Sequence, residues 1–223
     1  MFDWRWDFTF EILPRLLWAT LNTLAASGLG YGIALVLGLA FALGQRTPSR
    51  AVTWLVREFV EFIRSTPLVL QIFFIFYVFP QLGVRLSPWV SGMIAIGLHY
   101  AAYLSEVYRA GIDAVPKGQW EACRALNFST RYTYFKVVIP QAVPASLPGM
   151  GNYLIGIFKD TPMLSVIGVA ELMHTANALG SETYRFLEPY TLVGIIFLMI
   201  SLPSAGGLRL FEAWVRRNLG ITK

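Results

Sequence analysis

Long uncharged stretches alternate with short charged segments along this chain, and their lengths indicate membrane-crossing helices. A helix needs roughly 20 apolar residues to cross about 30 Å of hydrocarbon. The fourth stretch is the least regular, because three prolines between residues 140 and 148 interrupt its first half. We therefore begin its membrane helix near Gly149 and extend it to Val169. The pattern predicts an all-α membrane protein with five transmembrane helices, at residues 16–43, 65–84, 86–105, 149–169 and 189–208.

The composition supports this interpretation. Hydrophobic residues make up 56% of the chain and charged residues only 14%, which is too apolar for an ordinary soluble domain. Internal repeats, low-complexity tracts and flexible linkers are lacking in the sequence. We therefore expect one transmembrane domain over residues 1–223.

The positions of the basic residues predict the orientation, because Lys and Arg concentrate on the cytoplasmic side of short loops. Four of them, Arg5, Arg15, Arg85 and Arg185, fall on one predicted side. We expect the N-terminus outside and the C-terminus inside, and the net charge of +5 to face anionic lipid rather than nucleic acid. The thirteen basic residues of the predicted cytoplasmic side are Arg46, Arg50, Arg57, Arg64, Arg109, Lys117, Arg124, Arg131, Lys136, Arg209, Arg216, Arg217 and Lys223.

The predicted cytoplasmic segment between the third and fourth spans, residues 112–140, is polar and has the signals of two short helices. Pro116 suits a first helical turn, and Asn127 suits the left-handed residue that ends a helix. Ser129 can cap a second helix, which we expect Pro140 to stop. From these residues alone, the segment could dock onto another protein or lie on the inner leaflet.

The spacing within this segment resembles the EAA loop of ATP-binding-cassette importer permeases. That pattern is Glu-Ala-Ala, three residues, Gly, nine residues, then Ile-x-Leu-Pro. Here the series starts at Glu121-Ala122, with Cys123 for the second Ala and Asn127 for the Gly. Val137-Val138-Ile139-Pro140 closes it. Three further stretches, residues 62–68, 102–112 and 159–164, look like the polar amino acid permease subfamily.

This resemblance implies the fold of a type I importer permease in a bacterial inner membrane, together with its partners. They are a cytosolic ATPase dimer, a second permease subunit that is identical or homologous, and a periplasmic solute-binding protein. The chain lacks the phosphate-binding pattern Gly-x-x-x-x-Gly-Lys-Ser/Thr, so it is expected to be no enzyme and to hold no cofactor. ATP and Mg²⁺ would be bound by the partner ATPase.

By the same resemblance, the segment would couple transport to ATP hydrolysis. Glu121 would face a basic residue of the ATPase, while Trp120, Ala122 and Leu126 would fill its cleft. The expected ATPase-coupling residues are Gln119, Trp120, Glu121, Ala122, Cys123, Arg124, Leu126 and Asn127.

Ionisable groups inside the membrane are candidates for the substrate pathway, because exposing them to lipid is costly. Lys159 and Asp160 offer charges opposite to those of a zwitterion. Alternatively, these charges pair with each other or cap broken backbone, as Glu106 and Arg109 also could. Two histidines give no metal site. The full candidate set is Gln71, His99, Glu106, Lys159, Asp160 and Thr161.

The cargo expected from this resemblance is a polar amino acid or similar zwitterion. A compatible solute such as ectoine is an alternative, because aromatic residues are abundant. A secondary carrier driven by an ion gradient would more often show inverted repeats, and an intramembrane enzyme would need a clustered catalytic set. Neither of these two classes explains the polar cytosolic segment.

Overall fold

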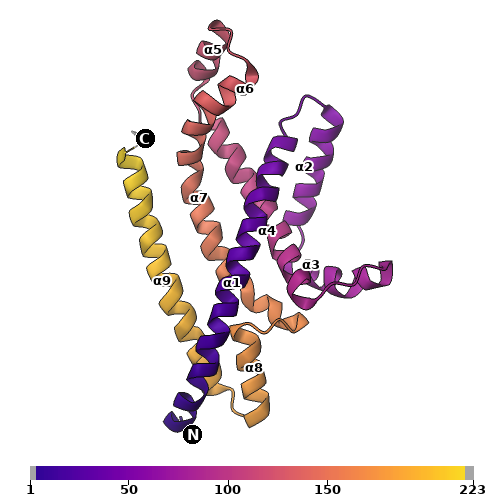
Figure 1. Ribbon diagram of the computed structural model, residues 1–223, viewed down its shortest axis with the longest axis vertical. Coiled ribbons are helices and arrows are strands. Elements are labelled where there is room, and N and C mark those ends of the chain that lie inside the picture. Colours follow the sequence, from indigo (N-terminus) through magenta and orange to yellow (C-terminus); the bar gives the residue numbers. More distant parts are fainter. Residues whose placement is uncertain (1–3, 219–223) are drawn as a thin grey trace.

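The computed structural model describes residues 4–218, apart from the side chains of Arg216 and Asn218, so Lys223 lies outside the described residues. This part of the chain consists of helices and their connections, without strands. Four long helices run along the long axis of the molecule (Figure 1). They are α1 (Trp6–Gly44), α4 (Pro88–Asp113), α7 (Ile139–Asp160) and α9 (Leu187–Asn218).

Shorter elements connect these helices and extend from both ends of the bundle. In Figure 1, α5 and α6 lie at one end, α8 lies at the other end, and α3 projects sideways below α2. The shorter α-helices are α2 (Arg50–Arg64), α3 (Leu68–Phe73), α5 (Lys117–Ala125), α6 (Thr130–Tyr132) and α8 (Leu172–Thr183). The π-helices are η1 (Phe74–Val78) and η3 (Thr133–Val138), and the 3-10 helices are η2 (Phe79–Leu82) and η4 (Thr161–Ile167).

Small residues bring α1 and α4 close together. A Cβ added at Gly38 would lie 2.9 Å from the Leu104 Cβ and 3.0 Å from the Ala101 carbonyl oxygen. Ala34 and Ala42 lie four residues before and after Gly38 and form a stripe of small residues with it. Both alanines are fully buried. Such spacing lets helix backbones approach closely in a membrane, where dispersion contacts replace the hydrophobic effect.

The helix that contains the predicted fourth span has other bounds than predicted. The helix begins at Ile139 rather than near Gly149, and it continues through Pro144 and Pro148. Pro144 and Pro148 lack the N–H groups that would bond the carbonyls of Pro140 and Pro144, yet the helix continues past both. Helix-breaking residues of this kind are tolerated in membrane helices.

This helix also ends earlier than predicted. The α-helical stretch stops at Asp160, where Pro162 lacks the N–H that would bond the Phe158 carbonyl, and a 3-10 turn follows. Gly168, with φ +80°, closes that turn in the left-handed region. Asp160 therefore lies at a helix end rather than in mid-helix.

Most of the predicted second span, residues 65–84, is the helical segment Leu68–Leu82, which is made of α3, η1 and η2. Helix α2 ends at Arg64, and the segment Leu68–Leu82 leaves at an angle of 105°. Pro67 lies in the break and starts the second segment in an extended conformation. The predicted first and fifth spans lie within α1 and α9, and most of the third lies within α4.

Two described helices, Trp6–Gly44 and Leu187–Val215, are long and apolar enough to cross a membrane by themselves. The number rises to four if each bent pair forms one span. The pairs are Arg50–Arg64 with Leu68–Leu82, and Thr130–Ile167 with Leu172–Thr183, which is bent by 46°.

The buried carboxyl group of Glu171, in the turn before α8, should make the stability of the protein depend on pH. Its fully buried carboxylate accepts hydrogen bonds from Met173 N at 2.9 Å and His174 N at 2.6 Å. Burial nevertheless raises its pKa from 4.5 to about 7. Since folding raises this pKa, the protonated form of Glu171 stabilises the folded protein. This contribution to the free energy of unfolding is complete below pH 4.5 and is lost as pH rises through 7, by up to roughly 3 kcal/mol.

We therefore expect the melting temperature of the purified protein in detergent to fall between pH 5 and pH 8. Glu171→Gln should flatten this dependence, while the exposed control Glu182→Gln should leave it unchanged. Equal slopes for Glu171→Gln and wild type would contradict the assignment.

Candidate coupling surface and translocation site

The polar segment forms a helix, a turn and a second helix, with the local conformations that the sequence predicts. Asn127 has φ +52°, and the end of α5 is closed by bonds from Phe128 N to Cys123 O and from Asn127 N to Arg124 O, each 3.0 Å long. These two bonds define a Schellman motif. Ser129 Oγ accepts from Tyr132 N at 3.3 Å. The predicted stop at Pro140 is wrong, since α6, η3 and α7 follow one another without a break.

Two of the expected coupling residues face their own chain. Cys123 is only 4% exposed, and the Trp120 ring packs edge-on against Tyr134 with centroids 5.5 Å apart. Trp120 and Tyr134 also cover a small cluster of buried residues, Ile112, Val115, Val138 and Ala142. Trp120 therefore holds α5 onto the rest of the molecule.

The other six expected coupling residues are exposed to solvent. Leu126, a large apolar side chain, is 64% exposed at the end of α5. The helix stands at the tip of the molecule, beyond the ends of α1 and α7 (Figure 1). The exposed face of α5 comprises Gln119, Glu121, Ala122, Arg124, Leu126 and Asn127.

Gln71 and His99 meet at the break between α2 and α3. Gln71 Nε2 donates to the Ile63 carbonyl at 2.8 Å and to Thr66 Oγ1 at 2.7 Å. Its Oε1 lies 3.2 Å from His99 Nδ1 on α4. Gln71 thus adds a bond to a carbonyl at the end of α2, which also accepts from Thr66 Oγ1 at 3.1 Å, and fixes the break onto α4.

Asp160 lies beside an aromatic wall on α4 and α7. The Tyr100 hydroxyl donates to Asp160 Oδ2 at 2.7 Å. The Tyr153 ring lies 6.0 Å from the Tyr100 ring and 5.7 Å from the Tyr103 ring, measured between centroids. The His99 ring lies 5.1 Å from that of Tyr103. The four rings form one contiguous cluster, in which Tyr103 and Tyr153 are half-buried and Tyr100 and His99 are buried; we call it the aromatic wall.

Arg64 lies at the other edge of the aromatic wall. Its guanidinium carbon is 5.5 Å from the Tyr103 centroid, and the Tyr103 hydroxyl donates to the Arg64 carbonyl oxygen at 3.3 Å. Arg64 Nε is buried without a hydrogen-bond partner among the described residues. A carboxylate and a guanidinium therefore flank an aromatic surface, which suits the two charges of a zwitterion.

Arg64 and three tyrosines of this site were not among the residues predicted from the sequence. Tyr100 and Tyr103 are three residues apart and so lie on one face of a helix, which was an available signal. Tyr153 and Arg64 come from other helices, and only the packing of α2, α4 and α7 brings them together.

Three other pathway candidates lie apart from the wall. Lys159 is exposed and has no ion pair with Asp160, because adjacent helix residues point in different directions. Thr161 is fully buried, and its Oγ1 donates to the Phe158 carbonyl at 2.8 Å. Glu106 pairs with Arg109 at 2.9 Å, as the alternative interpretation predicted.

Glu106 lines a separate polar cavity of about 660 Å³ at the ends of α1, α2 and α4. Seven residues separate it from His99, roughly 10 Å along the helix axis. The other residues of this polar cavity are Gln45, Arg46, Thr53, Arg57, Val60, Glu61, Arg109 and Tyr134.

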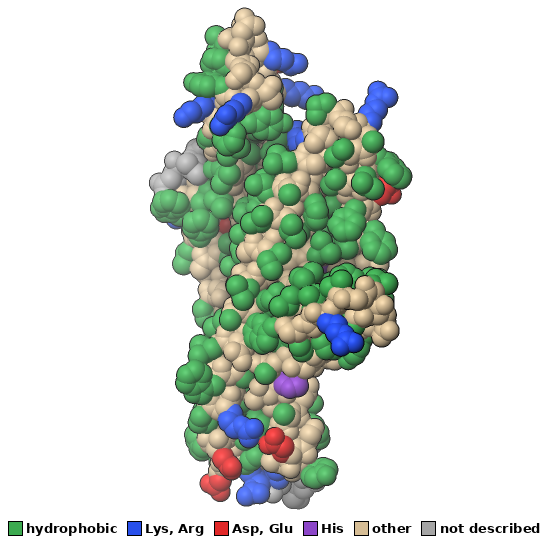
Figure 2. Space-filling model, turned by 45° about the vertical axis from the view of Figure 1, so that its right-hand side comes forward, with side chains coloured by type: hydrophobic (Ala, Val, Ile, Leu, Met, Phe, Trp, Pro, Cys, Tyr) green, Lys and Arg blue, Asp and Glu red, His purple; other side chains and the backbone are tan. Residues whose placement is uncertain are grey.

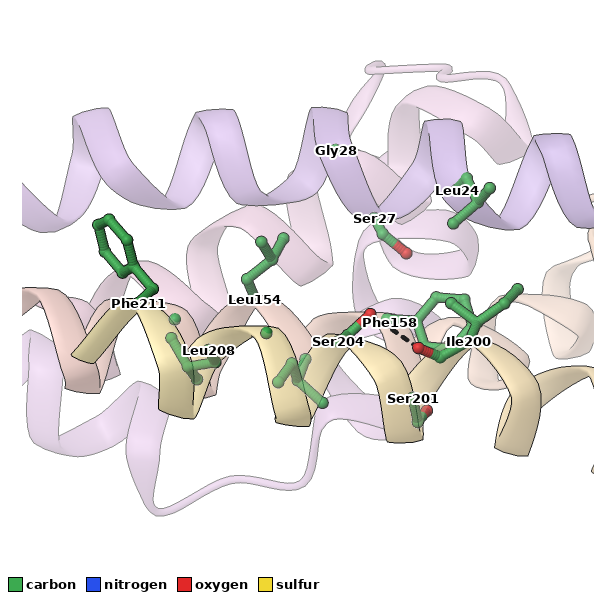
Figure 3. Close-up of a pocket in the computed structure, with 13 residues that line it drawn as sticks. Leu24, Ser27, Gly28, Leu154, Phe158, Ile200, Ser201, Ser204, Leu208 and Phe211 are labelled. Atoms are coloured by element: carbon green, nitrogen blue, oxygen red, sulfur yellow. Dashed lines mark hydrogen bonds between the residues drawn. The ribbon is translucent and has the colours of Figure 1, made fainter. Parts of the chain in front are cut away.

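An apolar groove of about 430 Å³ lies between α1, α7 and α9 (Figure 3). Its polar groups include serine hydroxyls bonded to their own helices, Ser27 to the Thr23 oxygen and Ser204 to the Ile200 oxygen, each at 2.7 Å. Charged side chains do not line it. The groove therefore does not suit a zwitterion, and the aromatic wall remains the better candidate.

Comparison with known proteins identifies the class of this protein. Residues 34–217 match the family described as binding-protein-dependent transport system inner membrane component, and the chain belongs to it. It is thus an inner membrane component of an ABC transporter, which favours the ATP-driven class over a carrier or an enzyme.

Individual relatives match over almost the full length. The chain is 39% identical to the "Probable amino-acid ABC transporter permease protein y4tG" of Sinorhizobium fredii, covering 95% of both chains. It is 35% identical to the L-cystine transport system permease protein TcyB of Bacillus subtilis, covering 86% of this chain and 87% of TcyB.

Solved structures share the fold. A crystal structure of an amino acid ABC transporter with histidines aligns with a TM-score of 0.89 and 32% identity, covering 95% of this chain and 99% of that chain. An inward-facing structure of the MetNI methionine ABC transporter has a TM-score of 0.64 at 19% identity, covering 90% of this chain and 96% of that chain. The latter supports the fold alone.

Proposed function

We propose that this chain is the membrane-spanning subunit of an ATP-driven importer that moves a polar amino acid or similar zwitterion into the cytoplasm. The exposed face of α5, fixed by Trp120 and by the Schellman motif, is the observation that carries the coupling assignment. Relatives named as amino-acid or cystine permeases support the class of cargo. A cytosolic ATPase dimer, which binds ATP and Mg²⁺, a second permease subunit and a periplasmic binding protein would complete the transporter.

We propose five spans with the N-terminus outside and the C-terminus inside. Helices α1, α4 and α9 would each cross the membrane, and residues 65–84 and 149–169 would supply the other two spans. Figure 2 supports this orientation: Lys and Arg side chains gather at the end that carries α5 and α6, while the flank is mainly hydrophobic. The exposed basic residues of that end include Lys117, Arg124, Arg131 and Lys136.

The coupling assignment predicts that changes on the exposed face of α5 separate ATP hydrolysis from transport. Reversing the charge in Glu121→Lys, or adding bulk in Ala122→Trp, should reduce ATP-driven uptake into proteoliposomes by about tenfold or more while the subunit stays inserted. Both positions are exposed, so neither change disturbs the core. Uptake and ATP hydrolysis by the purified complete transporter are the measurements.

Glu58→Lys on α2 is the matched control, because Glu58 is also exposed and lies outside the coupling segment. It should leave uptake per ATP unchanged. Normal coupling in both Glu121→Lys and Ala122→Trp would overturn the assignment of α5.

For the cargo, we propose that Asp160 receives the ammonium group and Arg64 the carboxylate. The cargo would lie along the aromatic wall between them, with His99 held in place by Gln71. Lys159, Thr161 and Glu106 would then have no direct contact with the cargo at this site. Glu106 would line the polar cavity closer to the cytoplasm.

A compatible solute such as ectoine is a second candidate, and the aromatic wall favours it. Ring faces attract a desolvated, delocalised cation, whereas a primary ammonium is well served by a carboxylate alone. Competition of unlabelled ectoine and unlabelled polar amino acids against labelled uptake distinguishes the candidates. Competition by ectoine alone supports the second candidate, and competition by amino acids alone supports the first.

A further inference from the structure

Tyr134 lies between the coupling helix and the ends of two long helices. It belongs to η3, the π-helix that joins α6 to α7. The wider turn of a π-helix displaces side chains from their regular α-helical positions, and such turns are frequent at functional sites. Tyr134 lines two cavities, one beside α5 and the polar cavity at the ends of α1, α2 and α4.

On one side, the Tyr134 ring touches α5. Its plane stands at 78° to the Trp120 ring, with centroids 5.5 Å apart, which is an edge-to-face contact. Such aromatic pairs contribute beyond the area they bury. Because Trp120 is the half-buried residue of α5, a shift of this helix has to move the Tyr134 ring or break the contact.

On the other side, Tyr134 lines the polar cavity together with Arg46, which forms an ion pair with Asp113. Arg46 Nη1 donates to Asp113 Oδ1 at 2.7 Å, joining the residue just beyond α1 to the last residue of α4. Burial acts to lower the pKa of Arg46, but its interactions with Asp113 and with Tyr134 outweigh burial and raise that pKa. Gln45 Oε1 also accepts from Arg109 at 2.8 Å, so the ends of α1 and α4 are joined twice.

We propose that Tyr134 is a positioning residue, whose ring follows α5 and whose hydroxyl holds Arg46, so that movement of α5 shifts the joined ends of α1 and α4. This inference rests on the proposed function, since it takes α5 to be moved by the ATPase. The backbone links α5 to α4 and α7 only at its two ends. Tyr134 adds a side-chain connection from the middle of α5 to α1, which has no backbone link to the segment.

Tyr134→Phe tests the connection most directly, because it keeps the ring against Trp120 and removes the hydroxyl. In proteoliposomes containing the complete transporter, we expect uptake per ATP hydrolysed to fall about 5-fold or more, with ATP hydrolysis retained. Arg46→Gln should have a similar effect. Arg46→Gln removes the link to Tyr134 as well as the ion pair with Asp113, so the double variant should be no worse than Arg46→Gln alone.

Melting temperatures close to that of wild type for Tyr134→Phe will show that the effect is not loss of folding. Wild-type uptake per ATP in Tyr134→Phe would overturn the proposal, as would a double variant whose loss equals the product of the two single losses. A loss of uptake matched by an equal loss of ATP hydrolysis would also overturn it.

Glu121→Lys separates this inference from the proposed function. If Glu121→Lys and Tyr134→Phe both couple normally, the coupling role of α5 fails as well. If Glu121→Lys uncouples transport while Tyr134→Phe does not, only the role of Tyr134 fails.

Discussion

Asp160→Asn should reduce uptake by about 30-fold or more, because removing one partner of a close charged contact typically costs 2–5 kcal/mol. Asparagine keeps the size of the side chain and can still accept the hydrogen bond from Tyr100, which is 2.7 Å long in wild type. The variant therefore removes the charge and little else. Initial rates of labelled uptake over a range of cargo concentrations, with ATP hydrolysis recorded in parallel, measure the effect.

Lys159→Gln is the matched control, since the two residues are neighbours and Lys159 is exposed. Its uptake should stay close to that of wild type. If Lys159→Gln loses uptake and Asp160→Asn does not, the cargo site is not beside the aromatic wall.

The second large effect is expected at Gly111, where α4 and α7 approach most closely. A Cβ at this position would collide with the Ser146 side chain and lie 2.8 Å from the Ala142 carbonyl oxygen. Backbone atoms of a packed helix cannot yield as a flexible side chain can. Gly111→Ala should therefore destabilise the protein by about 1–3 kcal/mol, seen as a lower melting temperature in detergent and less folded protein.

Gly32→Ala provides the comparison, because a Cβ there meets nothing within 4 Å. Replacing glycine by alanine within a helix without a clash stabilises it by up to about 1 kcal/mol. A melting temperature of Gly111→Ala equal to or above that of Gly32→Ala would contradict the close packing of α4 on α7.

Local features of this protein could be predicted from the sequence, since they depend on a few neighbouring residues. The helix end at Asn127 and the cap at Ser129 are of this kind. The stripe of small residues through Gly38 likewise indicates close helix packing, which α4 provides. Long apolar runs located the parts of the chain that became α1 and α9.

Other features depend on contacts that no local pattern contains. The break between α2 and α3 is fixed by Gln71, which bonds a carbonyl eight residues earlier and a histidine on α4. Helix α7 passes through Pro144 and Pro148, so counting prolines misplaced its start. Hydropathy could not reveal either arrangement.

In the candidate cargo site, too, some residues could be predicted from the sequence and others depend on the packing of the helices. Asp160 stands out in the sequence as an intramembrane charge, and it lies at the aromatic wall. Lys159 stands out equally, yet it points elsewhere because successive residues on a helix face different directions. Arg64 was assigned only to the basic side, and its place at the aromatic wall follows from the packing of α2 on α4.

Photo-cross-linking from α5 tests the central claim most directly. Benzophenone maleimide is attached to Ala122→Cys in a Cys123→Ser background, which removes the only native cysteine of this chain. The labelled subunit is assembled into the complete transporter and irradiated. We expect a covalent product with the ATPase subunit from this position, and none from the exposed control Glu58→Cys. A transport-active complex that gives no ATPase product from Ala122→Cys, or a product with the binding protein instead, would contradict the account.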